Sequence, residues 1–412
     1  MLAGPGAMPQ GRDLMVDRTD IVVVGAGPSG LAAACLVAEA GLAVTLVAGA
    51  AKAPESDPRT IALMQPSIRL LSHLGLWPGE LMAESAPLWR LKLVDDSPGL
   101  VSSGPVVFDA REIGPEPFGW NIPIGALTAA LDQRARGLGV SFVVDEAVRL
   151  QTSGAAALLR TASGLALSAH VVLAADGRAS LIRAAAKIAT VEWSYDQVAL
   201  ASSFDHSAPH LDTSVEYHKP AGPLTTVPMP GQRSSLVWLE RPERAQALAS
   251  MSDEDFARSL QAELHGDLGV VSNVGVRKLF PMRGLTAVAF ARNRVMLLGE
   301  AAHVLPPIGA QGLNMSLRDA ATAAELIATA AKFGDDPGAP DLLERYDRMR
   351  RRDVVPRQGV VDAVNRSLLA GSILPHGARV LGLMLAANIG PLRRRIMHQG
   401  LGPAELPRVM RG

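Results

Sequence analysis

Apolar and polar positions along this chain follow different periods in different stretches, and each period predicts a different kind of structure. Short unbroken apolar runs, such as residues 21–24 and 171–175, are typical of strands buried on both faces of a parallel sheet. Alternating segments prevail between 190 and 280, which favours an antiparallel sheet. Helical spacing returns after about residue 314. The pattern therefore predicts an α/β protein in which an antiparallel sheet interrupts a parallel one.

These changes of period also divide the chain. We expect the parallel-sheet domain at residues 19–190 and 281–330, with the antiparallel domain at 191–280 inserted between its two parts. Strand-like pieces within 88–115 are candidates to add strands to the inserted sheet. Residues 331–412 are expected to form C-terminal helices.

A glycine-rich turn follows the first apolar strand. The sequence GAGPSG places Gly25, Gly27 and Gly30 in GxGxxG register, with Pro28 and Ser29 between them, before a helix rich in small residues. The first glycine allows a tight turn, the second lets a pyrophosphate approach the backbone, and the third lets the helix pack on the strand. Because the turn joins a strand to a helix, it predicts a dinucleotide site.

One part of the dinucleotide pattern is missing. The second strand, residues 43–47, should be followed by an Asp or Glu that holds the adenosine ribose, and Ala48 stands there instead. Either another group holds the ribose or the sugar is held less tightly. The missing acid also weakens any preference for NAD over FAD as the dinucleotide.

A long polar loop connects the apolar strand 295–298 to the helix that begins near 314. Connections of this kind usually take about two to six residues, and this one is clearly longer. Its polar or conformationally special residues are Gly299, Glu300, His303, Pro306, Pro307, Gly309, Gln311, Gly312 and Asn314. Length and polar content favour a ligand-binding loop over a structural Ω-loop. His303 is a candidate proton shuttle, although we favour a structural role for it.

Two further positions are candidate ligand contacts. The buried strand 170–175 ends in Asp176-Gly177, and an acid at the carboxyl end of a parallel strand is where ligand contacts concentrate, although Asp-Gly is also a common turn. Residues 57–74 predict one helix. Arg59 near its start stands where the helix dipole favours an acid, which indicates either an anionic partner or a solvated surface arginine.

Composition narrows the classes of function. The chain has 412 residues, 48% apolar and 19% charged, with a formal net charge of zero, which gives no support for nucleic acid as a partner. The single cysteine, Cys35, excludes a disulfide framework and a zinc site built on cysteines. Residues 1–18 lack the apolar core of a signal peptide and are expected to be a disordered leader. No apolar run predicts a transmembrane helix, so we expect a cytoplasmic protein.

Arginines are frequent in the expected C-terminal helices, at positions 345, 348, 350, 351, 352, 357, 393, 394 and 395. An apolar segment, residues 380–387, lies between the two groups. One interpretation is solvated helix faces that pack on the core. The other is a basic, amphipathic surface for a partner in a biosynthetic complex or for the inner face of a membrane, where the protein would bind peripherally.

Taken together, the motifs resemble the class A flavoprotein aromatic hydroxylases, which share the p-hydroxybenzoate hydroxylase-like fold. That family has GxGxxG at its first strand, Asp-Gly midway and Gly-Asp…Pro…Gly-Gln-Gly-x-Asn late, and residues 25–30, 176–177 and 299–314 resemble this pattern in order and spacing. Within the class, DPRTIAL, HKPAGP and LRDA are similar to segments of the ubiquinone-biosynthesis hydroxylases. The resemblance implies a Rossmann-like FAD-binding domain with an inserted substrate domain.

The resemblance also implies roles at the pyrophosphate end of FAD. The glycine-rich turn, residues 25–30, would cradle the pyrophosphate, and Arg59 would lie beside the cofactor. Asp176 and Gly177 would sit near an entry shared with NAD(P)H. Gly299 and Glu300 would meet the ribityl or pyrophosphate part, although Glu300 stands where Asp is usual in the family.

At the flavin end, the resemblance implies that the contacts to the cofactor come mainly from backbone groups. The N–H groups of Gly312, Leu313 and Asn314 would face the N1/O2 edge of the flavin and stabilise its reduced, anionic form. Gly309 and Gln311 belong to the same loop. The proline pair, residues 306–307, would wall the reacting side of the flavin and keep water away.

The implied activity is hydroxylation of an electron-rich phenol ring, with NAD(P)H as transient reductant and O₂ as co-substrate. The flavin carries this chemistry, so no protein nucleophile is expected. The substrate is expected to be a polyprenylated phenol of ubiquinone biosynthesis, with a small soluble aromatic as the alternative. His218, where the quinone-pathway enzymes tend to have Phe, is a candidate substrate contact.

Two other functions stay open. The segment FGWNIP, residues 118–123, is similar to the Trp-x-Trp-x-Ile-Pro pattern of flavin-dependent halogenases, with Phe118 in place of the first Trp. Ala48 and Glu300 both depart from the hydroxylase pattern, which leaves a non-catalytic, flavin-binding accessory subunit of a biosynthetic complex as the other alternative.

Overall fold

The computed structural model describes residues 16–50, 59–96, 104–369, 389–403 and 405–412. Its centre is a sheet in the order β20-β21-β13-β2-β3-β9, here called the parallel sheet because only β20, at one edge, runs antiparallel. Its strands are β2 (Ile21–Val24), β3 (Val44–Ala48), β9 (Ser141–Val144), β13 (Val171–Ala174), β20 (Ala291–Arg292) and β21 (Val295–Leu297). Every residue of β2, β13 and β21 is buried, which accounts for their unbroken apolar sequences.

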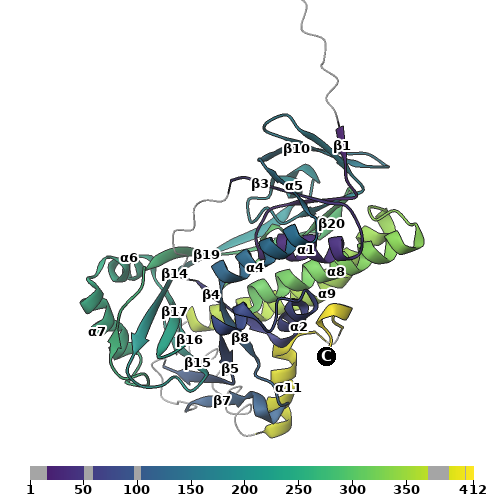
Figure 1. The fold of residues 1–412 in the computed structure, drawn as a ribbon. Coiled ribbons are helices and arrows are strands. Elements are labelled where there is room, and N and C mark those ends of the chain that lie inside the picture. Colours follow the sequence, from purple (N-terminus) through teal and green to yellow (C-terminus); the bar gives the residue numbers. More distant parts are fainter. Residues whose placement is uncertain (1–15, 51–58, 97–103, 370–388, 404) are drawn as a thin grey trace, which may run out of the picture.

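Three helices lie side by side against this sheet (Figure 1). Helix α1 (Pro28–Glu39) packs between α4 (Ile124–Gly137) and the long α8 (Gln311–Phe333). Residues 32–35 of α1 are three alanines and Cys35, all fully buried, and their small side chains let the helices approach closely. Cys35 is therefore a core residue.

A second sheet, in the order β1-β12-β11-β10, flanks the first. Its strands are β1 (Val16–Arg18), β10 (Ala147–Thr152), β11 (Ala157–Thr161) and β12 (Ala166–Ala169). Strand β1 pairs in parallel with β12, so the disordered leader expected at 1–18 is wrong for residues 16–18. Three residues are too few to show a period, and their pairing is with a strand 150 positions away. The remainder of the expected leader lies outside the described residues.

The helix expected at residues 57–74 is wrong in its first half. Thr60–Met64 form strand β4, which pairs antiparallel with β8 (Gly119–Pro123), and β8 pairs in turn with β5 (Ala86–Leu88). Thr60 and Ile61 are β-branched, which suits a strand. Helix α2 (Gln65–His73) begins only where Pro66 occupies its first turn, and the short α3 (Glu80–Ala83) follows it.

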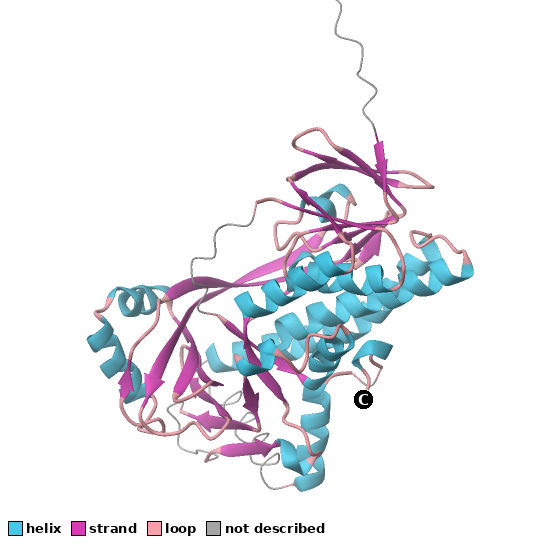
Figure 2. Ribbon diagram, viewed as in Figure 1, coloured by secondary structure: helices cyan, strands magenta, loops and turns pink. Residues whose placement is uncertain are grey.

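The antiparallel region forms a large sheet in the order β22-β19-β14-β17-β16-β15-β6-β7, with β18 beside β14. Figure 2 shows its two longest strands crossing toward the parallel sheet. The strands are β6 (Arg90–Asp95), β7 (Val106–Asp109), β14 (Thr190–His206), β15 (Thr213–Lys219), β16 (Gly222–Met229), β17 (Arg233–Glu240), β18 (Val271–Ser272), β19 (Lys278–Ala287) and β22 (His303–Val304). Residues 88–115 thus contribute β6 and β7, while the boundary expected at 280 falls inside β19.

The two faces of the large sheet have different partners. One face carries Leu200, Tyr217, Leu224 and Trp238, which pack on α6 (Pro242–Ser250) and α7 (Asp253–Glu263). Helix α6 was not expected from the sequence. Because side chains alternate along a strand, the neighbouring positions face the other way. That other face, which meets β4 and β8, is called the inner face below.

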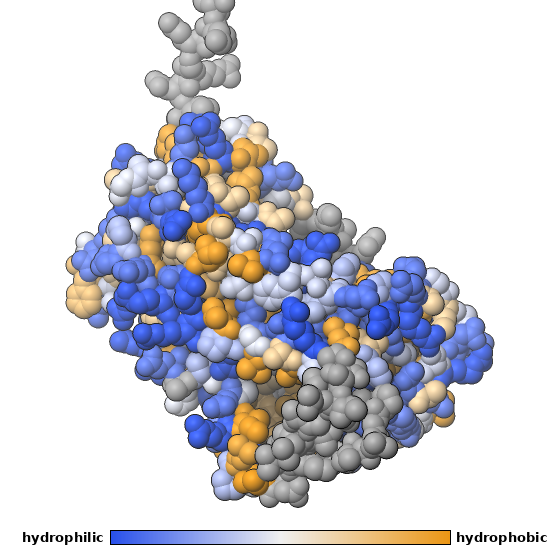
Figure 3. Space-filling view, turned by 180° about the vertical axis from the view of Figure 1, so that it is seen from behind, coloured by the Kyte–Doolittle hydropathy of each residue, from blue (hydrophilic) through white to orange (hydrophobic). Residues whose placement is uncertain are grey.

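The chain ends in helices α9 (Pro340–Leu369) and α11 (Gly390–Leu401) and the short helix η3 (Arg408–Met410). Among the described residues, no helix is both long enough and apolar enough to cross a bilayer. The apolar segment 380–387 lies outside the described residues. Seen from behind, hydrophilic residues are interspersed with apolar ones over this face of the molecule (Figure 3).

Candidate active site

Steric constraints shape the loop between β2 and α1. Gly25 has a φ of +109°, and a Cβ on it would overlap the carbonyl oxygen of Ala175. A Cβ on Gly30 would overlap the carbonyl oxygen of Gly25. At Gly27, by contrast, no atom lies within 4 Å of the place a Cβ would take. The outer two glycines therefore hold the loop, while the middle one leaves its surface open to a ligand.

Helix α1 begins at this loop, and neither a side-chain cap nor an acidic residue in its first turn neutralises the partial positive charge of its N-terminus. Gly27 caps it with no side-chain hydrogen bond, Pro28 occupies its first turn, and that turn holds no acidic residue. The N–H groups at a helix N-terminus carry partial positive charge and bind anions. The local geometry thus fits a pyrophosphate.

Asp176 and Gly177 lie against the same loop, since a Cβ on Gly25 would come within 3.0 Å of the Asp176 backbone nitrogen. One carboxylate oxygen of Asp176 accepts a hydrogen bond from the Ile182 N–H at 3.1 Å, at the start of α5 (Leu181–Ala185). The other oxygen, Oδ1, is buried without a hydrogen-bond partner among the described residues. Such an oxygen costs free energy unless a ligand or water pairs with it, so Asp176 fits a residue that contacts a bound molecule.

Gly299 brings the late loop to the start of α1. Its φ is +57°, and a Cβ on it would lie 3.2 Å from Ser29 Oγ in the first turn of α1 and 3.0 Å from Ser316 Oγ in α8. Glu300 follows in the short helix η2 (Gly299–Ala301), with its side chain exposed. Three motifs that are far apart in the sequence therefore meet at the carboxyl edge of the parallel sheet.

Arg183 joins two of these motifs, although it belongs to no sequence motif. Its guanidinium is buried and donates to the carbonyl oxygens of Ala301 at 2.9 Å and Arg178 at 2.8 Å. It thus joins the turn after Asp176 to helix η2. Both acceptors are main-chain groups, and one lies 118 positions away, so no local pattern marks them.

The second helix start, at α8, is also open. Gly309 and Ala310 both adopt left-handed backbone, with φ of +64° and +54°, and turn the chain into the helix. Within the described residues no side chain caps α8, and its first turn holds no acid. Gln311 only donates its side-chain amide back to the Gly309 carbonyl. Gly312 is exposed, with nothing within 4 Å of where its Cβ would be.

The two prolines before this turn, Pro306 and Pro307, have different environments. Pro306 is buried and its carbonyl accepts a hydrogen bond from the Ile308 N–H at 2.8 Å, whereas Pro307 is exposed. Only Pro307 therefore presents its ring to a molecule bound outside the loop, while Pro306 helps to hold the loop's shape.

The side chain of Asn314 is a structural cross-link. Its Oδ1 accepts hydrogen bonds from the Met64 N–H at 2.9 Å and the Ser67 hydroxyl at 2.7 Å. Its Nδ2 donates to the carbonyl oxygens of Ala62 at 2.8 Å and Ala310 at 2.7 Å. All its hydrogen-bonding positions are thus used in joining α8 to β4 and α2, so the backbone is what α8 offers to a ligand.

A buried ionic network stands behind the late loop. Asp319 of α8 is fully buried and accepts hydrogen bonds from the Gly299 N–H at 2.9 Å, from His303 Nε2 at 2.7 Å and from Arg350 Nε at 2.6 Å. Arg350, on α9, also donates to Asp353 at 2.9 Å. His303 is only 2% exposed, which agrees with a structural role and leaves it no open path to solvent as a shuttle.

Charge balance within this network lowers the pKa of its carboxylates. Burial alone would raise the pKa of Asp319, but the charges of Arg350 and His303 outweigh burial, and the pKa lies below its ordinary value. The pKa of Asp353 is likewise low because Arg318 and Arg350 outweigh its burial. Both carboxylates are therefore charged in the folded protein at neutral pH.

The other expected site residues lie toward the large sheet. The guanidinium of Arg59 lies over the ring of Phe280, on β19, at 5.1 Å from its centroid. His218, on β15, is next to Tyr217 in sequence and so faces the inner side of the sheet. It is buried, with Nε2 at 2.7 Å from the carboxylate of Glu216.

The arrangement fits a long anionic dinucleotide. Two helix N-termini, each without an acid or a side-chain cap, begin on either side of Gly299, and one open glycine lies at each of them. Asp176 adds a buried oxygen that lacks a partner. A family model described as an FAD binding domain matches residues 18–360. The chain belongs to the FAD binding domain family.

Two relatives of this chain are named as hydroxylases. The chain is 34% identical over 406 residues to the ubiquinone hydroxylase UbiL of Rhodospirillum rubrum, which covers 95% of this chain and 92% of that protein. It is 27% identical over 391 residues to the 3-demethoxyubiquinol 3-hydroxylase of Escherichia coli, covering 93% and 98%. The resemblance to flavoprotein hydroxylases is thereby confirmed: the cofactor is FAD and the protein is an FAD-dependent monooxygenase.

Solved structures show the same fold. The p-nitrophenol 4-monooxygenase PnpA of Pseudomonas putida matches with a TM-score of 0.77 at 19% identity, over 95% of this chain and 100% of that one. PqsL of Pseudomonas aeruginosa, a probable FAD-dependent monooxygenase, matches with a TM-score of 0.72 at 21% identity, over 89% and 99%. The expected α/β fold of this FAD-binding family is confirmed.

Proposed function

We propose that this protein hydroxylates the phenolic ring of a polyprenylated intermediate of ubiquinone biosynthesis. NAD(P)H is the proposed reductant and O₂ the proposed co-substrate. Two relatives that match more than nine-tenths of the chain are hydroxylases named for ubiquinone or a precursor of it. The observation that carries the proposal is this similarity over nearly the whole chain.

An apolar cluster lies beside the start of α8. It includes Ala310, Met64 and Phe108 and extends to Met397 and Leu401 of α11, with these side chains packed against one another. A prenyl tail of the proposed substrate would add apolar area to this region, worth about 25 cal/mol per Å² buried.

Bound FAD supplies the activation of oxygen, and the residues of the chain hold and shelter it. In our proposal the N–H groups at the start of α1 hold the pyrophosphate, with Asp176 and Glu300 beside it. Those at the start of α8 stabilise negative charge on the reduced flavin. The exposed ring of Pro307 keeps water from the reacting side, with Pro306 holding the loop behind it.

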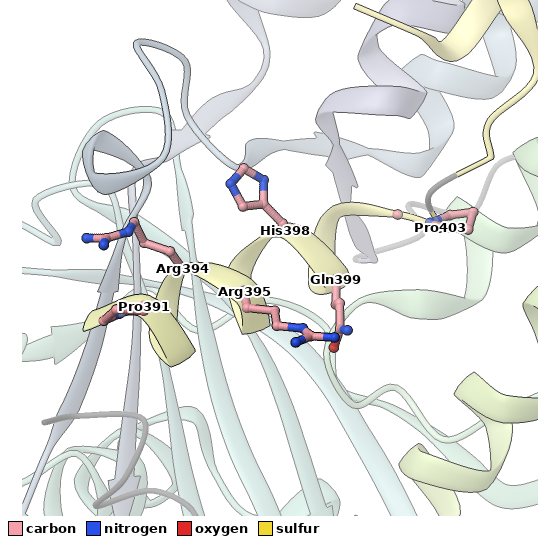
Figure 4. Close-up of a pocket in the computed structure, with 7 residues that line it drawn as sticks. Pro391, Arg394, Arg395, His398, Gln399 and Pro403 are labelled. Atoms are coloured by element: carbon pink, nitrogen blue, oxygen red, sulfur yellow. The ribbon is translucent and has the colours of Figure 1, made fainter. Parts of the chain in front are cut away.

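The outer face of α11 suggests where the tail enters. Arg394, Arg395 and His398 line a surface hollow of about 530 Å³ (Figure 4). Met397, on the same helix, is buried in the apolar cluster. The cationic side of α11 suits the surface of an anionic membrane, so we include peripheral contact with anionic lipid in the proposed function.

The catalytic part is tested with two substrates that share a phenol ring and differ only in the prenyl tail. With FAD-loaded protein, the proposal expects NAD(P)H oxidation coupled to a hydroxylated product seen by mass spectrometry, with kcat/KM about tenfold or more lower without the tail. Equal turnover of both would support the small soluble aromatic. A product that requires halide would support a halogenase, and no turnover of either would support the accessory subunit.

The membrane part is tested by sedimentation with vesicles. The double variant Arg394→Glu with Arg395→Glu is expected to lose most of its binding to vesicles that contain anionic lipid, because each basic residue near such a surface contributes about 1 kcal/mol. The control is Arg149→Glu with Arg244→Glu, which makes the same change of charge on β10 and α6, away from α11 (Figure 1). Equal loss in both pairs, or no binding by the unaltered protein, would contradict this part.

A further inference from the structure

The acid that usually stands at the end of this strand is missing from β3, so the adenosine ribose of the cofactor lacks its usual hydrogen-bond acceptor. In this fold a carboxylate at that position accepts hydrogen bonds from the hydroxyls of the adenosine ribose. Ala48 offers only a methyl group there. Since FAD is the cofactor, its ribose hydroxyls require an acceptor from another part of the chain, or else only water.

The neighbouring strand brings an acid to this place. Strand β9 runs parallel to β3, with Val144 in register with Ala48, and the Asp145 N–H donates to the Ala48 carbonyl at 2.9 Å. The next residue is Glu146. A Cβ built on Gly49 would lie 3.5 Å from Glu146 Cγ and 3.8 Å from its Oε1. The carboxylate of Glu146 thus lies against the backbone that directly follows Ala48.

The backbone of Glu146 is held on both sides. Its N–H donates to Asp145 Oδ1 at 2.8 Å, and its carbonyl accepts from the Ala162 N–H at 2.9 Å. Asp145 is already engaged, because its other oxygen accepts from the Ser163 N–H at 3.0 Å. The Glu146 carboxylate is exposed and has no hydrogen-bond or ion-pair partner within the described part of the chain. Glu146, and not Asp145, is therefore available to a ligand.

We propose that Glu146 supplies the ribose-binding carboxylate that Ala48 lacks, and that it accepts hydrogen bonds from the hydroxyls of the adenosine ribose of FAD. The acid reaches the ribose from the end of β9 instead of the end of β3. Strands β3 and β9 are adjacent and parallel, so they end at the same edge of the sheet. An acid after β9 therefore lies only one strand away from the usual position at the end of β3. The proposal depends on the FAD cofactor and not on the identity of the substrate.

The test is a titration of the FAD-free protein with FAD, followed by the change in flavin fluorescence. Glu146→Gln is expected to bind FAD about tenfold more weakly, since hydrogen bonds to a charged group are among the stronger ones. The control is Glu192→Gln, an exposed acid on β14 in the large sheet. It removes the same charge and is expected to bind as the unaltered protein does. Thermal unfolding of each FAD-free variant checks that the fold is kept.

A matched ligand makes the test specific for the ribose. An FAD analogue without the two adenosine ribose hydroxyls is expected to bind the unaltered protein about tenfold more weakly, yet to bind Glu146→Gln as well as FAD does. Unchanged FAD affinity in Glu146→Gln, or an equal loss for FAD and the analogue, would overturn the proposal. Protein that binds FAD in this way but does not hydroxylate a prenylated phenol would instead contradict the proposed function.

Discussion

The two loops that begin α1 and α8 do similar work by different means. In the first, Gly25 and Gly30 have no room for a Cβ, so main-chain contacts within about ten residues and one neighbouring strand set its shape. In the second, Gly309 and Gly312 have open space around them. That loop is held instead by side chains of the helix α8 that follows it, above all Asn314 and Asp319. A helix N-terminus can thus be prepared for an anion either by close backbone packing or by a network behind it.

The difference has a consequence for function. A loop set by backbone overlap has one accessible shape, which suits a pyrophosphate that does not change during turnover. A loop set by a buried network depends on groups in α8 and α9, so its shape is coupled to distant residues. Variants in the two loops should therefore fail in different ways.

The largest effect is expected for Gly30→Ala. Its new methyl would overlap the Gly25 carbonyl, and backbone cannot move aside as a side chain can. We expect FAD affinity to fall by about a hundredfold or more, together with lower stability, measured by FAD titration and thermal unfolding. Gly312→Ala is the matched control, with no atom within 4 Å of the new methyl, and its stability should change by less than about 1 kcal/mol. Similar losses in both would remove the distinction between the loops.

The second effect is expected for Asp319→Asn. Removing this charge leaves Arg350 buried with less compensation, which costs roughly 3–5 kcal/mol in the free energy of unfolding. Urea unfolding of the FAD-free protein measures it. Asp196→Asn breaks a pair whose two side chains are 61% and 72% exposed, and it should cost less than about 1 kcal/mol. Equal costs would show that the network contributes no more than a surface pair.

The same network predicts loss of stability in acid. The folded-state pKa values of Asp319 and Asp353 are lower than their ordinary values near 4. Their contribution is therefore complete above about pH 4 and is lost as pH falls through the lowered values. Urea unfolding at a series of pH values should show a decline in this window, and the decline should be shallower in Asp319→Asn. A parallel decline in both proteins would contradict the assignment.

Asn314→Ala should have a smaller effect, confined to the second loop. It leaves the buried Met64 N–H without its acceptor, at a cost of about 1–3 kcal/mol. Because α1 and its loop are untouched, the variant should bind ADP normally and FAD more weakly, whereas Gly30→Ala should weaken both. Calorimetric titration with each ligand checks this. Loss of ADP binding in Asn314→Ala would show that the two loops are not independent.

Parts of the fold with local causes could be predicted from the sequence. Residues 21–24 form a strand with the bounds that their apolar run suggested. The glycine-rich turn was also predictable, because it directly joins β2 to α1, although the residue that excludes a Cβ at Gly25 is Ala175, which lies far away in the sequence. At residues 60–64 the prediction of a helix failed, since pairing with β8, some sixty positions away, makes Thr60–Met64 a strand.

The candidate site, too, could be predicted only where its residues belong to a motif. The residues of the three motifs meet at one edge of the sheet, in the order that the family pattern implied. Their supports could not be predicted: Arg183 acts on main-chain oxygens, and Asp319 depends on Arg350 from another helix. Glu146 stands outside every motif, and only the register of β3 with β9 brings it beside Gly49.

The central claim is that these loops together form one FAD site in a monooxygenase. It is tested most directly by incubating the purified, FAD-free protein with FAD, removing unbound ligand by gel filtration, and recording the visible spectrum before and after anaerobic addition of NADPH or NADH. The account predicts one flavin per chain, with its visible bands retained by the protein and bleached by the reductant. A colourless protein after gel filtration would contradict it.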